Sequence, residues 1–173
     1  LAEADGFVPQ LQGWLDVQGA EVELVNGGVS GDTTAGGASR VEWSLTPEVD
    51  AMIVALGGND LLRGIDPGVS RGNLDKILQV AEAQEVPVLL VGMDAPGNYG
   101  AEYEAAFDAM YPELAEDYGT LYFESFFKGL GETDPSKARQ YFQSDGIHPN
   151  AEGVALIVEA MGPKVLELIG EVE

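Results

Sequence analysis

The chain contains a single histidine, which lies three residues after an aspartate in a turn rich in glycine and proline. His148 follows Asp145 within the segment Ser144–Asn150. A carboxylate so placed can accept a hydrogen bond from the imidazole Nδ1–H and stabilise the imidazolium, which leaves Nε2 free to take a proton from a nucleophile. The alternative is a surface turn in which Asp145 caps the following helix and His148 has no chemical role.

A second segment with chemical potential is Gly57-Gly58-Asn59-Asp60, which directly follows an apolar run. Its glycines allow a ligand to approach the backbone closely. The side-chain NH2 group of Asn59 is a donor that could stabilise an oxyanion. The alternative is a tight turn after a strand, in which Asp60 caps the next helix.

A third segment, Ser30-Gly31-Asp32-Thr33, presents the backbone N–H of Gly31 without a side chain in front of it. Such an N–H is a natural second donor to an oxyanion. One alternative is a helix start capped by Asp32 or Thr33. Another is a calcium site suggested by the Asp and Gly content, but the spacing of an EF-hand loop is absent.

These segments need a framework of strands and helices that brings them together. Continuous apolar runs predict strands of a parallel sheet covered on both faces, at 52–56, 87–93 and 120–123, with a shorter candidate at 22–26. Helical periodicity predicts helices around 7–15, 74–81, 101–118 and 151–170, the last broken at Gly162–Pro163. This alternation predicts one three-layer α/β/α domain over residues 1–173, in which ligands bind at the carboxyl ends of the strands.

The composition limits the classes of partner. The chain carries 30 Asp and Glu against 8 Lys and Arg, a net charge of −22, which disfavours nucleic acids and anionic membrane surfaces. No apolar run reaches the roughly 18 residues that span a bilayer, so we expect no membrane anchor. The absence of cysteine excludes disulfides and thiolate metal sites. We expect a small-molecule substrate and neither a metal nor a cofactor.

Taken in order and at their separations, the three segments resemble three of the four signature blocks of the SGNH (GDSL) hydrolases. The chain is most similar to the bacterial thioesterase I, lysophospholipase and arylesterase branch, which Asn98-Tyr99-Gly100, the helix through Phe107, and Tyr111-Pro112 also resemble. The resemblance covers nearly the whole chain. It implies a flavodoxin-like parallel sheet and a serine ester hydrolase that acts through an acyl-enzyme on small or medium acyl esters or thioesters.

The resemblance also implies roles for individual residues. Asp145 and His148 correspond to the acid and base of a Ser-His-Asp triad, and Gly31 and Asn59 to donors of the oxyanion hole. Loops at 61–66 and 95–99 are expected to line the acyl pocket, with the substrate-binding residues Leu61, Leu62, Ile65, Asn98 and Tyr99. The alternative for the three apolar side chains is ordinary packing of a loop on the core. Because relatives are often exported, a periplasmic or secreted bacterial location is expected.

The family's first block, Gly-Asp-Ser-Leu, carries the nucleophile at the end of the first strand and has no counterpart in this sequence. We therefore expect that strand and its serine to lie upstream of residue 1, so that the domain beginning at Leu1 is truncated at its N-terminus. Ser30 stands at the family position beside an oxyanion donor and is not expected to be the nucleophile. The remaining serines lie in predicted helices or loops without suitable neighbours: Ser39, Ser44, Ser70, Ser125, Ser136 and Ser144.

Two other functions share the predicted fold class. One is a non-catalytic α/β binding module, or an inactive fragment, that has lost the nucleophile; the presence of Gly31, Asn59, Asp145 and His148 together argues against it. The other is a flavodoxin-like mononucleotide binder, but the chain has no convincing phosphate loop and its net charge would repel phosphate. The sequence favours ester hydrolysis and indicates neither the physiological substrate nor the oligomeric state.

Overall fold

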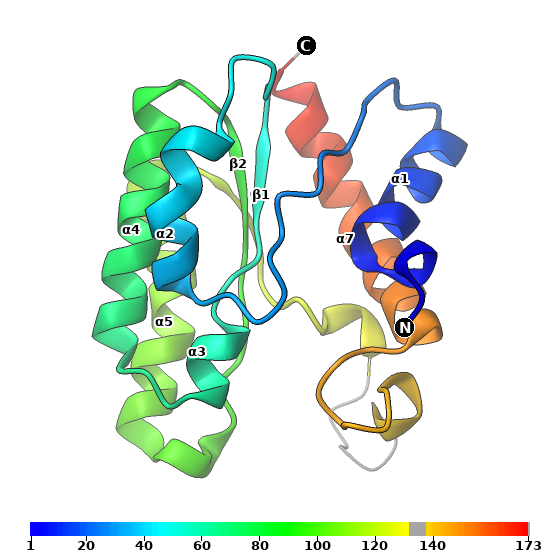
Figure 1. Cartoon of the computed structure of the whole chain (residues 1–173). Coiled ribbons are helices and arrows are strands. Elements are labelled where there is room, and N and C mark those ends of the chain that lie inside the picture. Colours follow the sequence, from blue (N-terminus) through cyan, green and yellow to red (C-terminus); the bar gives the residue numbers. More distant parts are fainter. Residues whose placement is uncertain (132–137, 173) are drawn as a thin grey trace. The chain divides into compact units, whose positions relative to one another are not determined.

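Three of the apolar runs form a parallel sheet in the computed structural model of the chain (Figure 1). The strands β1 (Met52–Val54), β2 (Val88–Val91) and β3 (Leu121–Phe123) lie in the order β1-β2-β3, with Leu89 of β2 opposite both Ile53 and Leu121. All four residues of the central strand β2 are buried. A strand that pairs on both edges and is covered on both faces has only apolar surroundings, which explains its uninterrupted Val-Leu-Leu-Val sequence. The predicted parallel sheet and α/β class are confirmed.

The structure describes residues 1–131 and 138–172, and these divide into two compact units. The first unit joins Leu1–Asn26 to Phe126–Glu167. The second unit contains Gly27–Ser125 together with the C-terminal residues from Leu168 onward. Ser136, one of the serines set aside above, lies outside the described residues. The expectation of a single domain stays a prediction.

In the second unit, three long helices lie side by side along one face of the sheet (Figure 1): α2 (Thr34–Ser44), α4 (Pro67–Ala83) and α5 (Ala101–Tyr118). Helix α4 begins where Asp66 accepts a hydrogen bond from the Gly68 N–H, and Pro67 occupies its first turn. The apolar faces of these helices and the sheet form one core, which includes Val41, Val54, Leu74, Ile77, Leu78, Leu90, Phe107, Met110, Tyr111 and Leu114. The helical periodicity at 74–81 and 101–118 therefore marks the buried faces correctly.

The turn after β1 can be built only with glycine. Gly57 has φ +123°, and a Cβ placed on it would lie 2.0 Å from the hydroxyl oxygen of Tyr111. That hydroxyl donates a 2.7 Å hydrogen bond to the carbonyl of Leu56, and burial raises the pKa of the phenol. The short helix α3 (Gly58–Leu62) starts directly after this turn and carries Asn59. The tight packing thus fixes the point at which the chain leaves the sheet.

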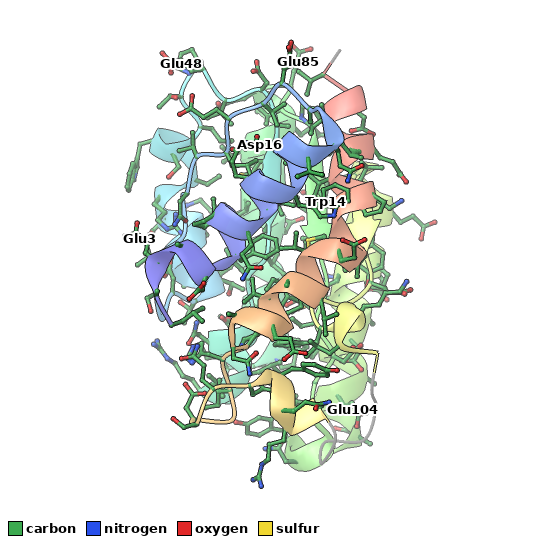
Figure 2. All side chains as sticks on the ribbon, turned by 90° about the vertical axis from the view of Figure 1, so that its right-hand side faces the viewer. Glu3, Trp14, Asp16, Glu48, Glu85 and Glu104 are labelled. Carbon is green, nitrogen blue, oxygen red and sulfur yellow. The ribbon has the colours of Figure 1, made fainter. Side chains whose placement is uncertain are left out.

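In the first unit, helix α1 (Phe7–Gln18) packs on helix α7 (Ala151–Gly170) through Trp14. The indole donates from Nε1 to Glu159, and its ring lies so close to Gly162 that a Cβ there would be 2.6 Å away. Trp14 is labelled in Figure 2. The predicted break at Gly162–Pro163 is wrong, since α7 continues through both residues. Pro163 removes one backbone hydrogen bond, and Trp14 packs on the adjacent turn at Gly162.

The predicted strand at 22–26 is also wrong, because this segment belongs to no strand of the described sheet. Its backbone is paired with a side chain instead of a neighbouring strand. The amide of Gln12 donates to the carbonyl of Val22 at 3.0 Å and accepts from the N–H of Leu24 at 2.7 Å. These two bonds satisfy backbone groups that a sheet would otherwise pair.

Short 3-10 helices complete the described chain: η1 (Glu3–Asp5), η2 (Gly97–Tyr99), η3 (Lys128–Leu130) and η4 (Arg139–Tyr141). Among the residues that the structure describes, no helix combines the length and apolar character needed to cross a membrane.

Candidate active site

His148 and Asp145 form the hydrogen-bonded pair that the sequence predicts. The imidazole Nδ1 lies 2.8 Å from Asp145 Oδ2, and 66% of the histidine side chain is exposed. With Nδ1–H donated to the carboxylate, the tautomer is fixed and Nε2 is the nitrogen available to a reactant. The pair therefore has the chemistry of a general base oriented by an acid.

The backbone of the Asp145–His148 turn is arranged around the other carboxylate oxygen. Asp145 Oδ1 accepts from the N–H of Ile147 at 2.9 Å and from the N–H of His148 at 3.0 Å. Gly146, with φ +67°, supplies the left-handed residue that the turn requires. The carboxylate is thus held at both oxygens, which keeps the imidazole in one orientation.

The interpretation of Asp145 as a helix cap is wrong, because another side chain caps α7. Asn150 Oδ1 accepts from the N–H of Gly153 at 2.9 Å, and the Asn150 amide also donates to the carbonyl of Gln140 at 2.7 Å. Asn150 therefore ties the turn both to the helix and to the preceding segment. Asp145 is left free of any capping role.

Hydrogen bonding lowers the pKa of Asp145 from its ordinary 3.8 to about 2, first through His148 and then through the two backbone N–H groups. Because the folded value is depressed, the ionised carboxylate favours the folded state above pH 3.8, and this contribution disappears as the pH falls toward 2. We expect the carboxyl carbon of Asp145 to titrate with a midpoint near pH 2 in a carbon-detected NMR titration. In His148→Ala the midpoint should move back toward 3.8, since the strongest cause is removed. A midpoint near 3.8 in the unmodified protein would contradict this geometry.

Gly31 lies in a tight turn that exposes its backbone. The N–H of Asp32 donates to the carbonyl of Val29 at 3.1 Å, and Gly31 occupies the third position of the turn with φ +77°, a value that favours glycine. A Cβ on Gly31 would meet nothing within 4 Å. Within residues 1–131 and 138–172 the Gly31 N–H has no hydrogen-bond partner. It is available to a ligand.

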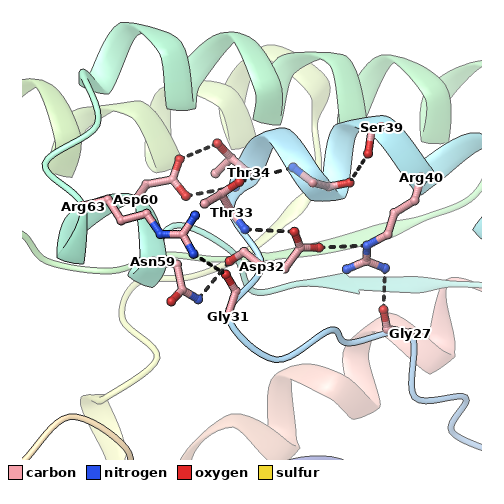
Figure 3. Close-up of polar contacts among 11 residues, drawn as sticks. Gly27, Gly31, Asp32, Thr33, Thr34, Ser39, Arg40, Asn59, Asp60 and Arg63 are labelled. Carbon is pink, nitrogen blue, oxygen red and sulfur yellow. Dashed lines mark hydrogen bonds and ion pairs between the residues drawn. The ribbon is translucent and has the colours of Figure 1, made fainter.

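Asn59 is attached to the same turn (Figure 3). Its Nδ2 donates to the carbonyl of Asp32 at 2.9 Å. This bond uses one of the two amide hydrogens and determines which way the amide faces, so that the second hydrogen remains for a ligand. The two predicted oxyanion donors, Gly31 and Asn59, are therefore brought to one turn and linked through Asp32.

Two arginines also hold the turn, in a chain that has only 8 basic residues in total (Figure 3). Arg63 Nη2 donates to the carbonyl of Gly31 at 3.0 Å. Arg40 Nε contacts Asp32 Oδ2 at 2.9 Å, and its Nη1 donates to the carbonyl of Gly27. Sequence reasoning missed both residues, because nothing in the local spacing relates them to Gly31.

The segment Ser30–Thr33 was also considered as a helix start or a calcium site. Thr33 is the N-cap of α2 and accepts from the N–H of Gly36, so the capping interpretation of this segment is correct for Thr33 and coexists with the exposed turn. Asp32 accepts hydrogen bonds from Arg40 and from the N–H of Thr33. In the part of the chain that the structure describes, no group of three or more candidate ligands could hold a metal.

Asp60 does not cap the helix that follows it, contrary to the alternative considered for it. It is completely buried within α3, and Asp66 caps the next helix instead. Its carboxylate accepts hydrogen bonds from Thr34 and Ser70. Sequence reasoning missed this network, since Thr34 and Ser70 lie far from Asp60 along the chain.

The 61–66 loop, one of the two predicted to line an acyl pocket, contacts Tyr99 of the other loop and Tyr103 of the following helix. The ring of Tyr99 lies 4.8 Å from that of Tyr103, and Gly64 approaches Tyr99 so closely that a Cβ would be 3.1 Å away. Tyr103 also donates to the carbonyl of Ile65 at 2.8 Å. Segments 61–66 and 97–103 are therefore in contact with each other, and 61–66 follows Asn59 closely along the chain.

The predicted substrate-binding side chains differ in exposure. Leu62 and Tyr99 are exposed, at 54% and 41%, and Asn98 is exposed as well. Ile65 is half-buried, and Leu61 packs against the core, as the structural alternative anticipated for this loop. Leu62, Asn98 and Tyr99 thus remain the side chains most available to a ligand.

The candidate residues are distributed over both units. Asp145 and His148 belong to the first unit, whereas Gly31, Asn59 and the 61–66 loop belong to the second. The first unit thus contains an exposed imidazole bonded to a carboxylate, and the second contains two hydrogen-bond donors on one turn. Acyl transfer needs groups of both kinds.

Comparison with known proteins gives a consistent result. Residues 2–156 match the GDSL-like Lipase/Acylhydrolase family. Esterase TesA of Pseudomonas aeruginosa is 36% identical over 170 residues, which cover 98% of this chain and 82% of that protein. Thioesterase 1/protease 1/lysophospholipase L1 of Escherichia coli is 33% identical over 87% of this chain and 70% of its own length. An arylesterase of Vibrio mimicus is 32% identical over 86% of this chain and 72% of its own length.

Solved structures agree. The crystal structure of TesA superimposes with a TM-score of 0.86 at 35% identity, covering 97% of this chain and 91% of that chain. The structure of AlinE4, an SGNH-hydrolase family esterase, gives a TM-score of 0.77 at 37% identity over 96% and 87% of the two chains. These likenesses confirm the expected SGNH hydrolase fold and give no support to a non-catalytic binding module. The chain therefore belongs to the GDSL-like lipase/acylhydrolase family and is an ester hydrolase of the serine type.

Proposed function

We propose that His148, Asp145, Asn59 and Gly31 carry out the hydrolysis of acyl esters and thioesters through an acyl-enzyme. The observation that carries this proposal is the 2.8 Å bond between His148 Nδ1 and Asp145 Oδ2 on an exposed imidazole. Its Nε2 takes the proton of a serine hydroxyl as that oxygen attacks the acyl carbonyl. The sequence contains no Gly-Asp-Ser, so the proposal assigns every role except the nucleophile to residues 1–173.

The oxyanion that forms on the acyl carbonyl is stabilised by the Gly31 N–H and the second amide hydrogen of Asn59. Both donors are held in place before the reaction, by the turn at Gly31 and by the bond from Asn59 to Asp32. Preorganised donors of this kind stabilise charge only as it develops, which lowers the barrier to the reaction. His148 then gives its proton to the departing alcohol or thiol, and a water molecule repeats the sequence on the acyl-enzyme.

The substrate class follows from the surface beside Asn59. Leu62 and Tyr99 offer apolar area, and Asn98 adds a polar group on the same surface. This suits the acyl chain of a small or medium ester, and the names of the relatives (esterase, thioesterase, lysophospholipase, arylesterase) support the same class. We also propose a periplasmic or secreted location, which the bacterial origin of the relatives supports.

An assay of the full gene product against a series of acyl esters tests this function. We expect hydrolysis of p-nitrophenyl acetate, butyrate and octanoate and of an acyl thioester, with kcat/KM dependent on acyl length. Leu62→Ala and Tyr99→Ala should change KM for the longer chains more than for acetate, because only the longer chains reach the apolar surface. Absence of hydrolysis of every member of the series by correctly folded protein would overturn the proposal.

A further inference from the structure

The most deeply buried polar cluster in the second unit lies next to the oxyanion donors and has no role in the mechanism so far. The side chains of Asp60, Thr34 and Ser70 are all 0% exposed. Asp60 Oδ2 accepts from the Thr34 N–H at 2.9 Å, and Asp60 Oδ1 accepts from the hydroxyls of Thr34 at 2.6 Å and Ser70 at 2.8 Å (Figure 3 shows the bonds to Thr34). The cluster joins helices α2, α3 and α4.

The direction of the hydrogen bonds in this cluster is determined by a fourth residue. Asn73 Nδ2 donates to Thr34 Oγ1 at 3.0 Å. Since the Thr34 oxygen accepts this bond, the hydroxyl proton of Thr34 points to Asp60. Every bond at Asp60 is then one in which the carboxylate accepts. Hydrogen bonds to a carboxylate are among the strongest in proteins and hold their donors at defined positions.

Burying a carboxylate is costly, and well-packed apolar side chains often give equal or better stability. Overall stability is therefore a weak explanation for a carboxylate at this position. Its neighbours supply a better one. Asp60 follows Asn59 directly, and Thr34 comes two residues after the Val29–Asp32 turn that contains Gly31. The bonds between Asp60 and Thr34 therefore join the two elements that carry the oxyanion donors.

We propose that Asp60 is a positioning residue that fixes the Gly31 turn and Asn59 relative to each other, with Thr34 as its partner. This inference rests on the proposed function, since it holds that the Asp60–Thr34 bonds set the distance between the two oxyanion donors. Asp60 does not touch substrate, because it is completely buried. The Asn59–Asp32 bond near the surface and the Asp60–Thr34 bonds beneath it form two parallel links between α3 and the turn.

The first test is Asp60→Asn, which preserves shape and removes one acceptor. The amide oxygen can keep the bond from the Thr34 N–H, but the NH2 group then faces the Thr34 and Ser70 hydroxyls, and the Thr34 proton loses its acceptor. We expect kcat to fall about 10- to 100-fold with KM changed less than about threefold, the pattern of misplaced groups that act only in the transition state. Thr34→Val, which retains the N–H and loses only the hydroxyl, should give a smaller fall of about fivefold and provides a test if Asp60→Asn does not fold.

A second change should restore the network with its hydrogen bonds reversed. In Asp60→Asn/Asn73→Asp, the amide at position 60 donates to the Thr34 and Ser70 hydroxyls, and the new carboxylate at position 73 accepts the Thr34 proton. Shape and net charge are those of the original protein. For the double variant we expect kcat within about threefold of the original value. In Asn73→Asp alone, two carboxylates compete for the single hydroxyl proton of Thr34, so this variant should lose activity as Asp60→Asn does.

Ser70→Ala is the matched control, because it removes one bond from Asp60 without altering any bond to Thr34. We expect it to lower the free energy of unfolding in a urea titration while kcat changes less than about twofold. If kcat instead follows the free energy of unfolding equally in Ser70→Ala and Asp60→Asn, the cluster is only structural and the inference is overturned. It is also overturned if folded Asp60→Asn keeps its kcat, or if the double variant is no better than Asp60→Asn.

A readout that does not need catalysis separates this inference from the proposed function. The backbone amide of Gly31 and the side-chain NH2 of Asn59 give signals in a nitrogen-15 NMR spectrum. Both should shift or broaden in Asp60→Asn and return in the double variant. Unchanged signals in Asp60→Asn overturn the inference, whereas an inactive unmodified protein with the expected NMR shifts contradicts only the proposed function.

Discussion

Replacing His148 by alanine is expected to lower kcat for p-nitrophenyl butyrate by about 10⁴-fold or more, with little change in KM. His148 is the only histidine of the chain, and its Nδ1 lies 2.8 Å from Asp145 Oδ2. Without it, no group is positioned to take the proton of the nucleophile or to return it to the leaving group. The side chain is 66% exposed, so its removal leaves no buried cavity, and the loss should not come from unfolding.

Ser144→Ala is the matched control for this variant. Ser144 is exposed and directly precedes Asp145 in the same turn. Removing its hydroxyl therefore tests whether any substitution in this turn reduces activity. We expect kcat within about twofold of the original value, as is usual for surface substitutions without a functional contact. Circular dichroism should show that both variants are folded. A folded His148→Ala protein that retains more than a tenth of the original kcat would disprove the base assignment.

The second large effect is expected for Asn59→Ala, which should lower kcat about 100- to 1000-fold while KM changes little, the usual cost of one oxyanion donor. The amide is fixed by its bond to Asp32, so its second hydrogen is aimed before the substrate binds. The loss therefore affects the transition state and not the ground-state complex. Steady-state kinetics on p-nitrophenyl butyrate give both constants.

Gln79→Ala serves as the control for removal of an amide elsewhere in the second unit. Gln79 is exposed on α4 and donates to Asp75 on the same helix. We expect no measurable change in kcat. If Asn59→Ala raised KM and left kcat unchanged, Asn59 would be a binding group and not an oxyanion donor.

The sequence predicts the architecture of the second unit well because burial leaves a clear pattern there. The continuous apolar run at Val88–Val91 is the central strand, and the stripe through Phe107, Met110 and Leu114 is the buried face of α5. The segment 22–26 has the same short-range pattern and is not a strand. Its backbone is paired by Gln12, a contact that local hydrophobicity cannot indicate.

The candidate site could be predicted where its residues are neighbours in sequence. Asp145 and His148 are three positions apart, and their hydrogen bond follows from that spacing. Asp60 and Arg63 could not be assigned in this way. Their partners, Thr34 and Gly31, lie 26 and 32 positions away, and only the folded chain brings them together.

Pro163, inside helix α7, shows a different limit of sequence-based prediction. A glycine followed by a proline is typical of a helix end, yet α7 continues through both. Trp14 packs on Gly162, where a side chain would not fit, and such tertiary contacts are not visible in the local sequence. Tertiary packing outweighs a local preference of about 3 kcal/mol.

Covalent labelling by a p-nitrophenyl phosphonate ester tests most directly whether these residues serve a serine hydrolase. The serine oxygen attacks phosphorus and displaces p-nitrophenolate, which leaves a stable tetrahedral adduct that mass spectrometry detects on the intact protein. We predict one adduct per molecule of full gene product, loss of esterase activity in proportion to labelling, and labelling of His148→Ala slowed by about 10³-fold or more, because the base acts in this attack as well. Labelling of His148→Ala at the original rate, or hydrolysis that continues in fully labelled protein, would contradict the account.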